Sequence, residues 1–277
     1  MKKNICFILC MALINVVEAQ TFNETITKEL TFEKVGLENT VFVSNINGDI
    51  HVQGYEGTSV LLEVSKKITA KTQQGLELGK SEIQLGVIDR ADTLIFYLID
   101  GCHAFSERNL KSRNFGTRNK WAYNWEGSNE CISKYDFTLD FTIKVPFSVN
   151  LILSTINDGD IKVENVNGAL KVENINGSII LKNITREAFA TTINGNVDIE
   201  YAKNPEKACR FYTLNGDINA WFQKGLMANT NFKSFNGELY SNVQQLESLP
   251  VQVEKERGAA ETKYKLNGNR FKIHKKN

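Results

Sequence analysis

The stretch IKVENVNGALKVENINGSII, residues 161–180, repeats one short phrase after nine residues. Each copy holds two apolar residues in alternation, a Glu-Asn pair, one further apolar residue and then Asn-Gly. The phrase recurs over most of the chain, which is typical of folds built from repeated units. Aligned on this motif, successive glycines lie 18, 18, 21 and 21 residues apart, at Gly159, Gly177, Gly195, Gly216 and Gly237.

The phase of the apolar residues decides how these units fold. Asn-Gly between alternating apolar residues usually indicates a tight β-hairpin. In GALKVENING the apolar residues are Leu170, Val172 and Ile175, and a step of three in a flat strand would turn Ile175 away from the core. A chain that turns at Glu-Asn resets this phase, and Asn-Gly then marks a second corner. We therefore expect an all-β fold, a parallel β-solenoid with coils of 18–21 residues.

Stacked coils bring equivalent residues into columns. One predicted column is interior and aliphatic, while the asparagines of the Asn-Gly motif are expected to stack as a structural ladder along one corner. The segments at residues 21–39 and 263–277 would cap the two open ends. The interior column consists of Ile161, Ile179, Val197, Ile218 and Leu239, and the corner ladder of Asn157, Asn176, Asn194, Asn215 and Asn236.

The N-terminus has the features of a signal peptide over residues 1–19. Lys2 and Lys3 precede an apolar core, and Val17-Glu18-Ala19 provides compact residues at a cleavage site. We expect an exported protein, in the periplasm, on the cell surface or outside the cell, with residues 20–277 as a single β-solenoid domain. Cleavage would remove two lysines and one glutamate from 33 basic and 32 acidic residues, leaving 31 of each. This balance disfavours nucleic acid as a partner, and no later segment has transmembrane length.

The segment FTIKVPFSVNLILSTINDGDIKVENVNGALKVENINGSI, residues 141–179, resembles the putative-adhesin family of secreted bacterial β-strand-repeat proteins, a domain of unknown function. The shared features are a strand ending in Val145-Pro146, a following strand and serial Ser/Thr-x-Asn-Gly units. The resemblance covers roughly residues 40–70 and 135–273. It implies a right-handed parallel β-solenoid outside the cytoplasm, and it brings no catalytic or binding residues.

Residues from about 70 to 134 depart from the repeat as one long inserted loop. Within it, DTLIFYLIDG at residues 92–101 is predicted to form a strand. We favour a disulfide between Cys102 and Cys131, which flank a polar stretch, and two unpaired thiols are the alternative. Cys209 has apolar neighbours and is expected to be a small buried residue.

The inserted loop carries the candidate binding residues. Trp121, Tyr123 and Trp125 alternate, so an extended segment would place their rings on one face, where they could stack on sugars or on a protein. The alternative is that these rings cover the side of the solenoid and hold the loop in place. The basic residues expected to take part are Arg113, Arg118 and Lys120.

Catalysis, metal binding and cofactors find little support in the sequence. The three histidines are far apart and lack a nucleophile motif or metal spacing. Asp49, Asp160 and Asp217 follow Asn-Gly at equivalent positions, but Ser178, Asn196 and Glu238 interrupt the row, so solvated corners are favoured over calcium ligands.

These observations predict an exported, non-enzymatic protein that binds glycan or protein ligands as a putative adhesin. One alternative is a periplasmic or envelope scaffold without a dedicated ligand. A further alternative, a polysaccharide lyase or hydrolase, depends on analogy with other β-helices alone.

Overall fold

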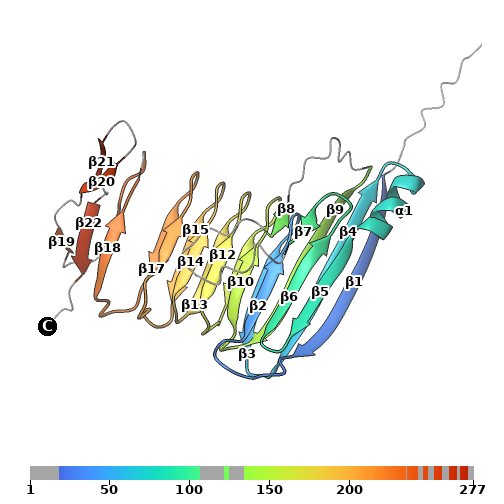
Figure 1. Ribbon diagram of the computed structural model, residues 1–277, viewed down its shortest axis with the longest axis horizontal. Helices are drawn as coiled ribbons and strands as arrows, with labels where there is room; N and C mark the ends of the chain where they lie inside the picture. Colours follow the sequence, from blue (N-terminus) through green and yellow to red (C-terminus); the bar gives the residue numbers. More distant parts are fainter. Residues whose placement is uncertain are drawn as a thin grey trace, which may run out of the picture.

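The computed structural model describes residues 19–106, 122–124, 134–234 and 236–242, together with four short strands between residues 246 and 273. Most of the described strands belong to two sheets that lie along the long axis of the molecule (Figure 1). In spatial order, the first sheet contains β1 (Gln20–Thr31), β4 (Ser59–Ala70), β9 (Asp136–Pro146), β3 (Ile50–Tyr55), β11 (Ile161–Glu164), β13 (Ile179–Ile184), β15 (Val197–Tyr201) and β17 (Ile218–Trp221). The second contains β16 (Arg210–Tyr212), β14 (Ala188–Thr191), β12 (Leu170–Glu173), β10 (Asn150–Ser154), β2 (Thr40–Ser44), β6 (Thr93–Ile99) and β5 (Gln84–Arg90).

From β10 to β17 the chain alternates between the two sheets. We call one full turn of the chain around the core a lap, and each lap adds one strand to each sheet. Neighbouring laps pair in parallel: Ile161 lies beside Ile179, Ile179 beside Val197, and Val197 beside Ile218. The first three side chains of this column are fully buried between the sheets. The parallel pairing excludes hairpins between successive Asn-Gly units, and each corner resets the phase of the apolar residues.

The prediction of a single right-handed parallel β-solenoid is wrong. The sheets are mixed, because β4 pairs antiparallel with both β1 and β9, and β5 pairs antiparallel with β6. The reason lies in strand length: β4 has 12 residues and β9 has 11, against four to six in β11 to β15. Strands of that length extend beyond one side of a lap, and β1 and β4 pair over twelve residues.

The prediction of one long inserted loop from 70 to 134 is wrong for the first part of this excursion, residues 70–106, which contains regular secondary structure. It begins with α1 (Gln73–Glu82) and continues through the β5–β6 hairpin. Because β6 pairs with β2, this hairpin forms one end of the second sheet. The strand predicted in DTLIFYLIDG is confirmed as β6. The helix was missed because Gly75 and Gly79 weaken its pattern. Both glycines are needed where α1 packs closely: a Cβ on Gly79 would lie 2.7 Å from the Ile68 side chain and 2.8 Å from the Tyr135 ring.

The Asn-Gly corner is held by side chains that bridge consecutive laps. Thr192 Oγ1 donates to the Gly177 carbonyl at 2.8 Å, and Thr213 Oγ1 donates to the Gly195 carbonyl at 2.8 Å. Asn174 Nδ2 makes the same bond to the lap before, also at 2.8 Å. The laps approach so closely here that a Cβ on Gly195 would lie 2.2 Å from the Gly177 carbonyl oxygen.

Both edge strands of the first sheet are largely exposed. At one edge β1 has only Phe22, Ile26 and Leu30 half-buried, and at the other edge all four residues of β17 are exposed. Beyond β17, β18 (Ala228–Phe232) pairs with β22 (Asn269–Ile273), which also pairs with β19 (Leu246–Ser248), and β20 (Val253–Arg257) pairs with β21 (Thr262–Leu266). Leu239, predicted to extend the interior column, lies outside a strand and is 44% exposed, as is Ile218. Burial of the column therefore ends at Val197.

Candidate functional site

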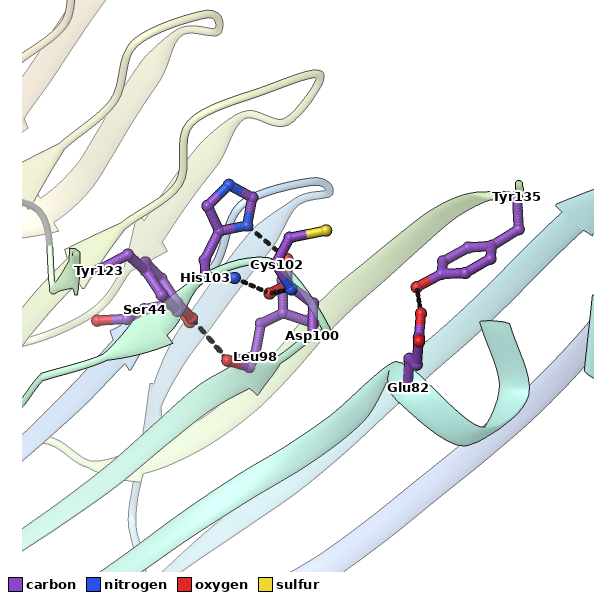
Figure 2. A network of polar contacts seen from close by, with 8 residues as sticks. All are labelled: Ser44, Glu82, Leu98, Asp100, Cys102, His103, Tyr123 and Tyr135. Carbon is purple, nitrogen blue, oxygen red and sulfur yellow. Dashed lines mark hydrogen bonds and ion pairs between the residues drawn. The ribbon is translucent and has the colours of Figure 1, made fainter. Parts of the chain in front are cut away.

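The segment with the predicted binding residues leaves the second sheet at Asp100, directly after β6 (Figure 2). Asp100 Oδ1 accepts hydrogen bonds from the backbone N–H of Cys102 at 3.1 Å and of His103 at 2.6 Å. Its other oxygen lies 2.7 Å from His103 Nδ1. The Asp100 side chain is only 4% exposed, so one buried carboxylate fixes the turn from which the segment departs.

Tyr123 anchors the middle of the segment from β8 (Tyr123–Asn124), which pairs with β7 (Ala104–Phe105). The Tyr123 hydroxyl donates to the Ser44 carbonyl at 2.8 Å, with the Leu98 carbonyl at 3.1 Å (Figure 2). It also accepts from the Leu98 N–H at 2.9 Å. Burial raises the pKa of the Tyr123 hydroxyl well above its ordinary value, against a smaller opposite effect of the Leu98 backbone hydrogen bond. The phenol is therefore neutral and able to donate.

Ala122, next to Tyr123 in the sequence, packs against the outer face of the second sheet. Ala122 is 4% exposed and forms a small apolar cluster with Phe42, Ile95 and Ile152, which point away from the main core. Phe105 joins this cluster and stacks on Tyr97 with ring centroids 3.9 Å apart. Ala122 and Phe105 thus pack on the outer face of β2, β6 and β10.

The segment rejoins the first sheet at Tyr135, just before β9. The Tyr135 hydroxyl donates to Glu82 Oε2 at 2.6 Å, at the end of α1 (Figure 2). Burial, followed by the hydrogen bond to Glu82, raises the pKa of Tyr135. Asp100, Tyr123 and Tyr135 therefore fix the segment at its beginning, middle and end.

The structure places only part of the predicted binding row. Tyr123 is 4% exposed, so it cannot belong to an exposed aromatic face; it occupies the position of the alternative, in which a ring holds the loop against the sheet. Cys102 is disulfide-bonded, and its partner is outside the described residues, as is Cys131. Cys209 is a free thiol, half-buried, with its sulfur 3.1 Å from the Tyr201 hydroxyl. The remaining predicted residues also lie outside the described part of the chain: Trp121, Trp125, Arg113, Arg118 and Lys120.

The asparagines of the repeat form a continuous hydrogen-bonded row over four laps. Asn176 Nδ2 donates to Asn157 Oδ1 at 3.3 Å, Asn194 to Asn176 at 2.7 Å, and Asn215 to Asn194 at 2.7 Å. Asn236 lies in the exposed stretch after β18. These amides connect laps to one another, which is a structural role.

The acidic residues after Asn-Gly take part in a second row of hydrogen bonds between laps. Asp49 Oδ1 accepts from the Asp160 N–H at 2.7 Å, Asp160 Oδ1 from the Ser178 N–H at 2.7 Å, and Asn196 Oδ1 from the Asp217 N–H at 2.9 Å. Ser178 and Asn196 fit this row because it needs a side-chain oxygen and no charge. Within the described residues, no group of three His, Cys, Asp or Glu side chains is arranged to hold a metal ion.

Sequence reasoning missed two kinds of residue. The first kind is the Thr or Asn two positions before the corner asparagine. Its side chain donates to the glycine carbonyl of the lap before, and because it recurs in the repeat it could have been found from the sequence. The Asp100 turn has no repeated counterpart, and only the fold shows that it starts the segment.

The sequence model of the Toastrack DUF4097 family matches residues 29–276, and the chain belongs to this family. This agrees with the resemblance found in the repeat. No curated protein matches the chain. Among the described residues, no helix is long and apolar enough to cross a bilayer.

The solved structures that match this chain include two described as adhesion proteins. One, a putative cell adhesion protein from Clostridium sporogenes, is 12% identical with a TM-score of 0.35, over 73% of this chain and 100% of that one. Another, a putative adhesin from Bacteroides fragilis, is 13% identical with a TM-score of 0.26, over 71% of this chain and 97% of that one.

Proposed function

We propose that the chain is an exported, non-enzymatic binding protein that presents the segment between Asp100 and Tyr135 to a glycan or protein ligand at the cell surface. The observation that carries this proposal is that described residues of the segment are fixed at three points: the Asp100 turn after β6, Tyr123 on β2 and β6, and Tyr135 on α1. Loops fixed on a rigid scaffold are where binding residues concentrate in proteins. A binding segment that is attached at several points loses less conformational entropy when a ligand binds than a segment that is free between its ends.

Tyr123 explains how such a loop can present its neighbours. Its ring and hydroxyl are committed to Leu98 and Ser44, and Ala122 is buried beside it. Trp121 and Trp125 flank this anchor in the sequence. The proposed recognition surface therefore comprises Trp121 and Trp125 with the basic residues Arg113, Arg118 and Lys120, and it excludes Tyr123.

The test is a double variant, Trp121→Ala with Trp125→Ala, measured for binding to whole cells and to arrayed glycans. We expect binding to fall at least about tenfold, as for the loss of aromatic anchors at an interface. Trp221→Ala is the matched control, because Trp221 is 56% exposed on β17, in a different part of the fold. Unchanged binding of the double variant, with an unchanged melting temperature, would contradict the proposal.

A periplasmic scaffold without a ligand is the second candidate, and it makes a different prediction about location. Protease treatment of intact cells should degrade the protein if it is exposed at the surface. Full protection, together with degradation after the outer envelope is opened, would favour the scaffold.

A further inference from the structure

A groove lies along one corner of the stack, opposite the corner that carries the row of Asn157, Asn176, Asn194 and Asn215. It has a volume of about 340 Å³, within the range of small-molecule sites. Its walls come from the end of β3, the turn between β9 and β10, the corner after β11, the irregular end of β13 and the residue after β15. The lining residues are Gly54, Phe147, Asn165, Asn167, Asn183 and Ala202.

Two asparagines give the groove a repeated polar wall. Asn165 and Asn183 occupy equivalent corners of adjacent laps, and both have φ of 58°, a left-handed conformation that asparagine tolerates better than most residues. Asn183 Nδ2 donates to Asn165 Oδ1 at 2.6 Å, and Thr185 Oγ1 donates to Asn167 Oδ1 at 3.2 Å. These bonds fix the orientation of the three amides.

The same bonds leave part of each amide available. Within the described residues, Asn165 Nδ2, Asn167 Nδ2 and Asn183 Oδ1 have no hydrogen-bond partner. Two donors and one acceptor therefore lie along the wall. In the Asn-Gly row, by contrast, Asn176 and Asn194 use both amide atoms on their neighbours in the stack.

The other wall is an aromatic ring. Phe147 is 39% exposed although it is large and apolar. Gly54 leaves space for the Phe147 ring, because a Cβ at position 54 would lie 3.1 Å from the ring and 1.9 Å from the Asn165 carbonyl oxygen. The groove thus combines an accessible ring with fixed amide groups, and none of its described lining residues carries a charge.

We infer that this groove binds an uncharged oligosaccharide. The C–H face of a sugar ring can pack on Phe147, while neighbouring hydroxyl groups, each both donor and acceptor, can pair with the amides of Asn165, Asn167 and Asn183. An anionic glycan would find no described cation in the lining. An extended peptide would need an unpaired strand edge, whereas the groove is made of corners between paired strands.

The experiment measures binding to an array of neutral and anionic oligosaccharides. The variants are Phe147→Ala, which removes the ring, and Ala202→Trp, which fills the groove from an exposed position. The matched control is Asn194→Ala, which removes an amide of the same type from the opposite corner. Melting temperatures of all variants show that they are folded.

We expect the intact protein to bind neutral oligosaccharides, and both groove variants to lose about tenfold or more in affinity, while Asn194→Ala retains it. Binding restricted to anionic glycans, equal binding by the groove variants, or no binding to the array would overturn the inference. None of the lining residues of the groove belongs to the segment between Asp100 and Tyr135. Loss of cell binding in the tryptophan variant, with neutral-glycan binding intact, would therefore concern only the function proposed above.

Discussion

At the scale of single residues, a few buried polar groups determine how the excursion is held. Tyr123 is the clearest of these, because its hydroxyl makes hydrogen bonds to the backbone of both β2 and β6. Most buried polar groups in proteins are paired in this way, since an unpaired one loses its contact with water without compensation.

Replacing Tyr123 with Phe should lower the free energy of unfolding by about 1–3 kcal/mol, because the Leu98 N–H and the Ser44 carbonyl lose a partner inside the protein. Chemical denaturation measures this loss. Tyr55→Phe is the control: among the described residues its hydroxyl bonds the Ser59 carbonyl alone, at a half-exposed position, and its removal should cost less. Equal losses in the two variants would mean that Tyr123 is not a special anchor.

At the scale of the element, the Asn-Gly corner connects the laps through three side-chain positions and one glycine. The glycine is needed for space and for conformation, since Gly177, Gly195 and Gly216 all have positive φ and each faces the carbonyl of the glycine in the lap before. An added side chain must push two laps apart.

Gly195→Ala should therefore destabilise the protein by about 1–3 kcal/mol or more, the usual effect of overpacking, with backbone strain in addition. Thermal unfolding measures it. Gly36→Ala serves as the control, because nothing lies within 4 Å of a Cβ at that position, and it should leave the melting temperature nearly unchanged. A similar small effect at Gly195 would show that the laps can separate without cost.

The laps are also the part of the fold that sequence could predict. The spacing of Asn157, Asn176 and Asn194 and the three-residue step to Ile175 are local signals, and they gave the parallel stacking and the corner asparagines in advance. The pairing of β4 with β1 and β9 was not predictable, because alternation in a long strand shows that one face is buried but not which strand lies beside it.

The candidate sites were harder to predict than the laps. The residues around Tyr123 in the sequence do not distinguish a buried ring from an exposed one. Only its contacts with Ser44 and Leu98 in the fold show that it is buried. The groove beside Phe147 brings together residues from positions 54 to 202, so no local pattern describes it.

At the scale of the whole molecule, the stack should tolerate removal of a complete lap. Deletion of residues 178–195 joins Gly177 to Asn196 and places Val197 where Ile179 lies, beside Ile161. Because repeat folds depend mainly on contacts between neighbours, we expect a cooperative, folded protein whose melting temperature falls by several degrees.

Deletion of residues 178–186 is the control for this experiment. It removes half a lap, moves every later strand to the opposite sheet and brings the Asn-Gly corners to the wrong side. This variant should fail to fold, as measured by circular dichroism and thermal unfolding. Folding of both variants, or of neither, would contradict the view of the lap as the unit of the structure.

The hydrogen bonds between laps run along the stack, and the chain enters at the β1 end and leaves beyond β17 (Figure 1). A pull between the two ends would therefore load these bonds one lap after another instead of shearing them together. A released lap of 18 residues provides roughly 60 Å of extended chain. If the protein is attached to the cell at one end and to a ligand at the other, it would yield to tension in steps of this length, as an elastic tether.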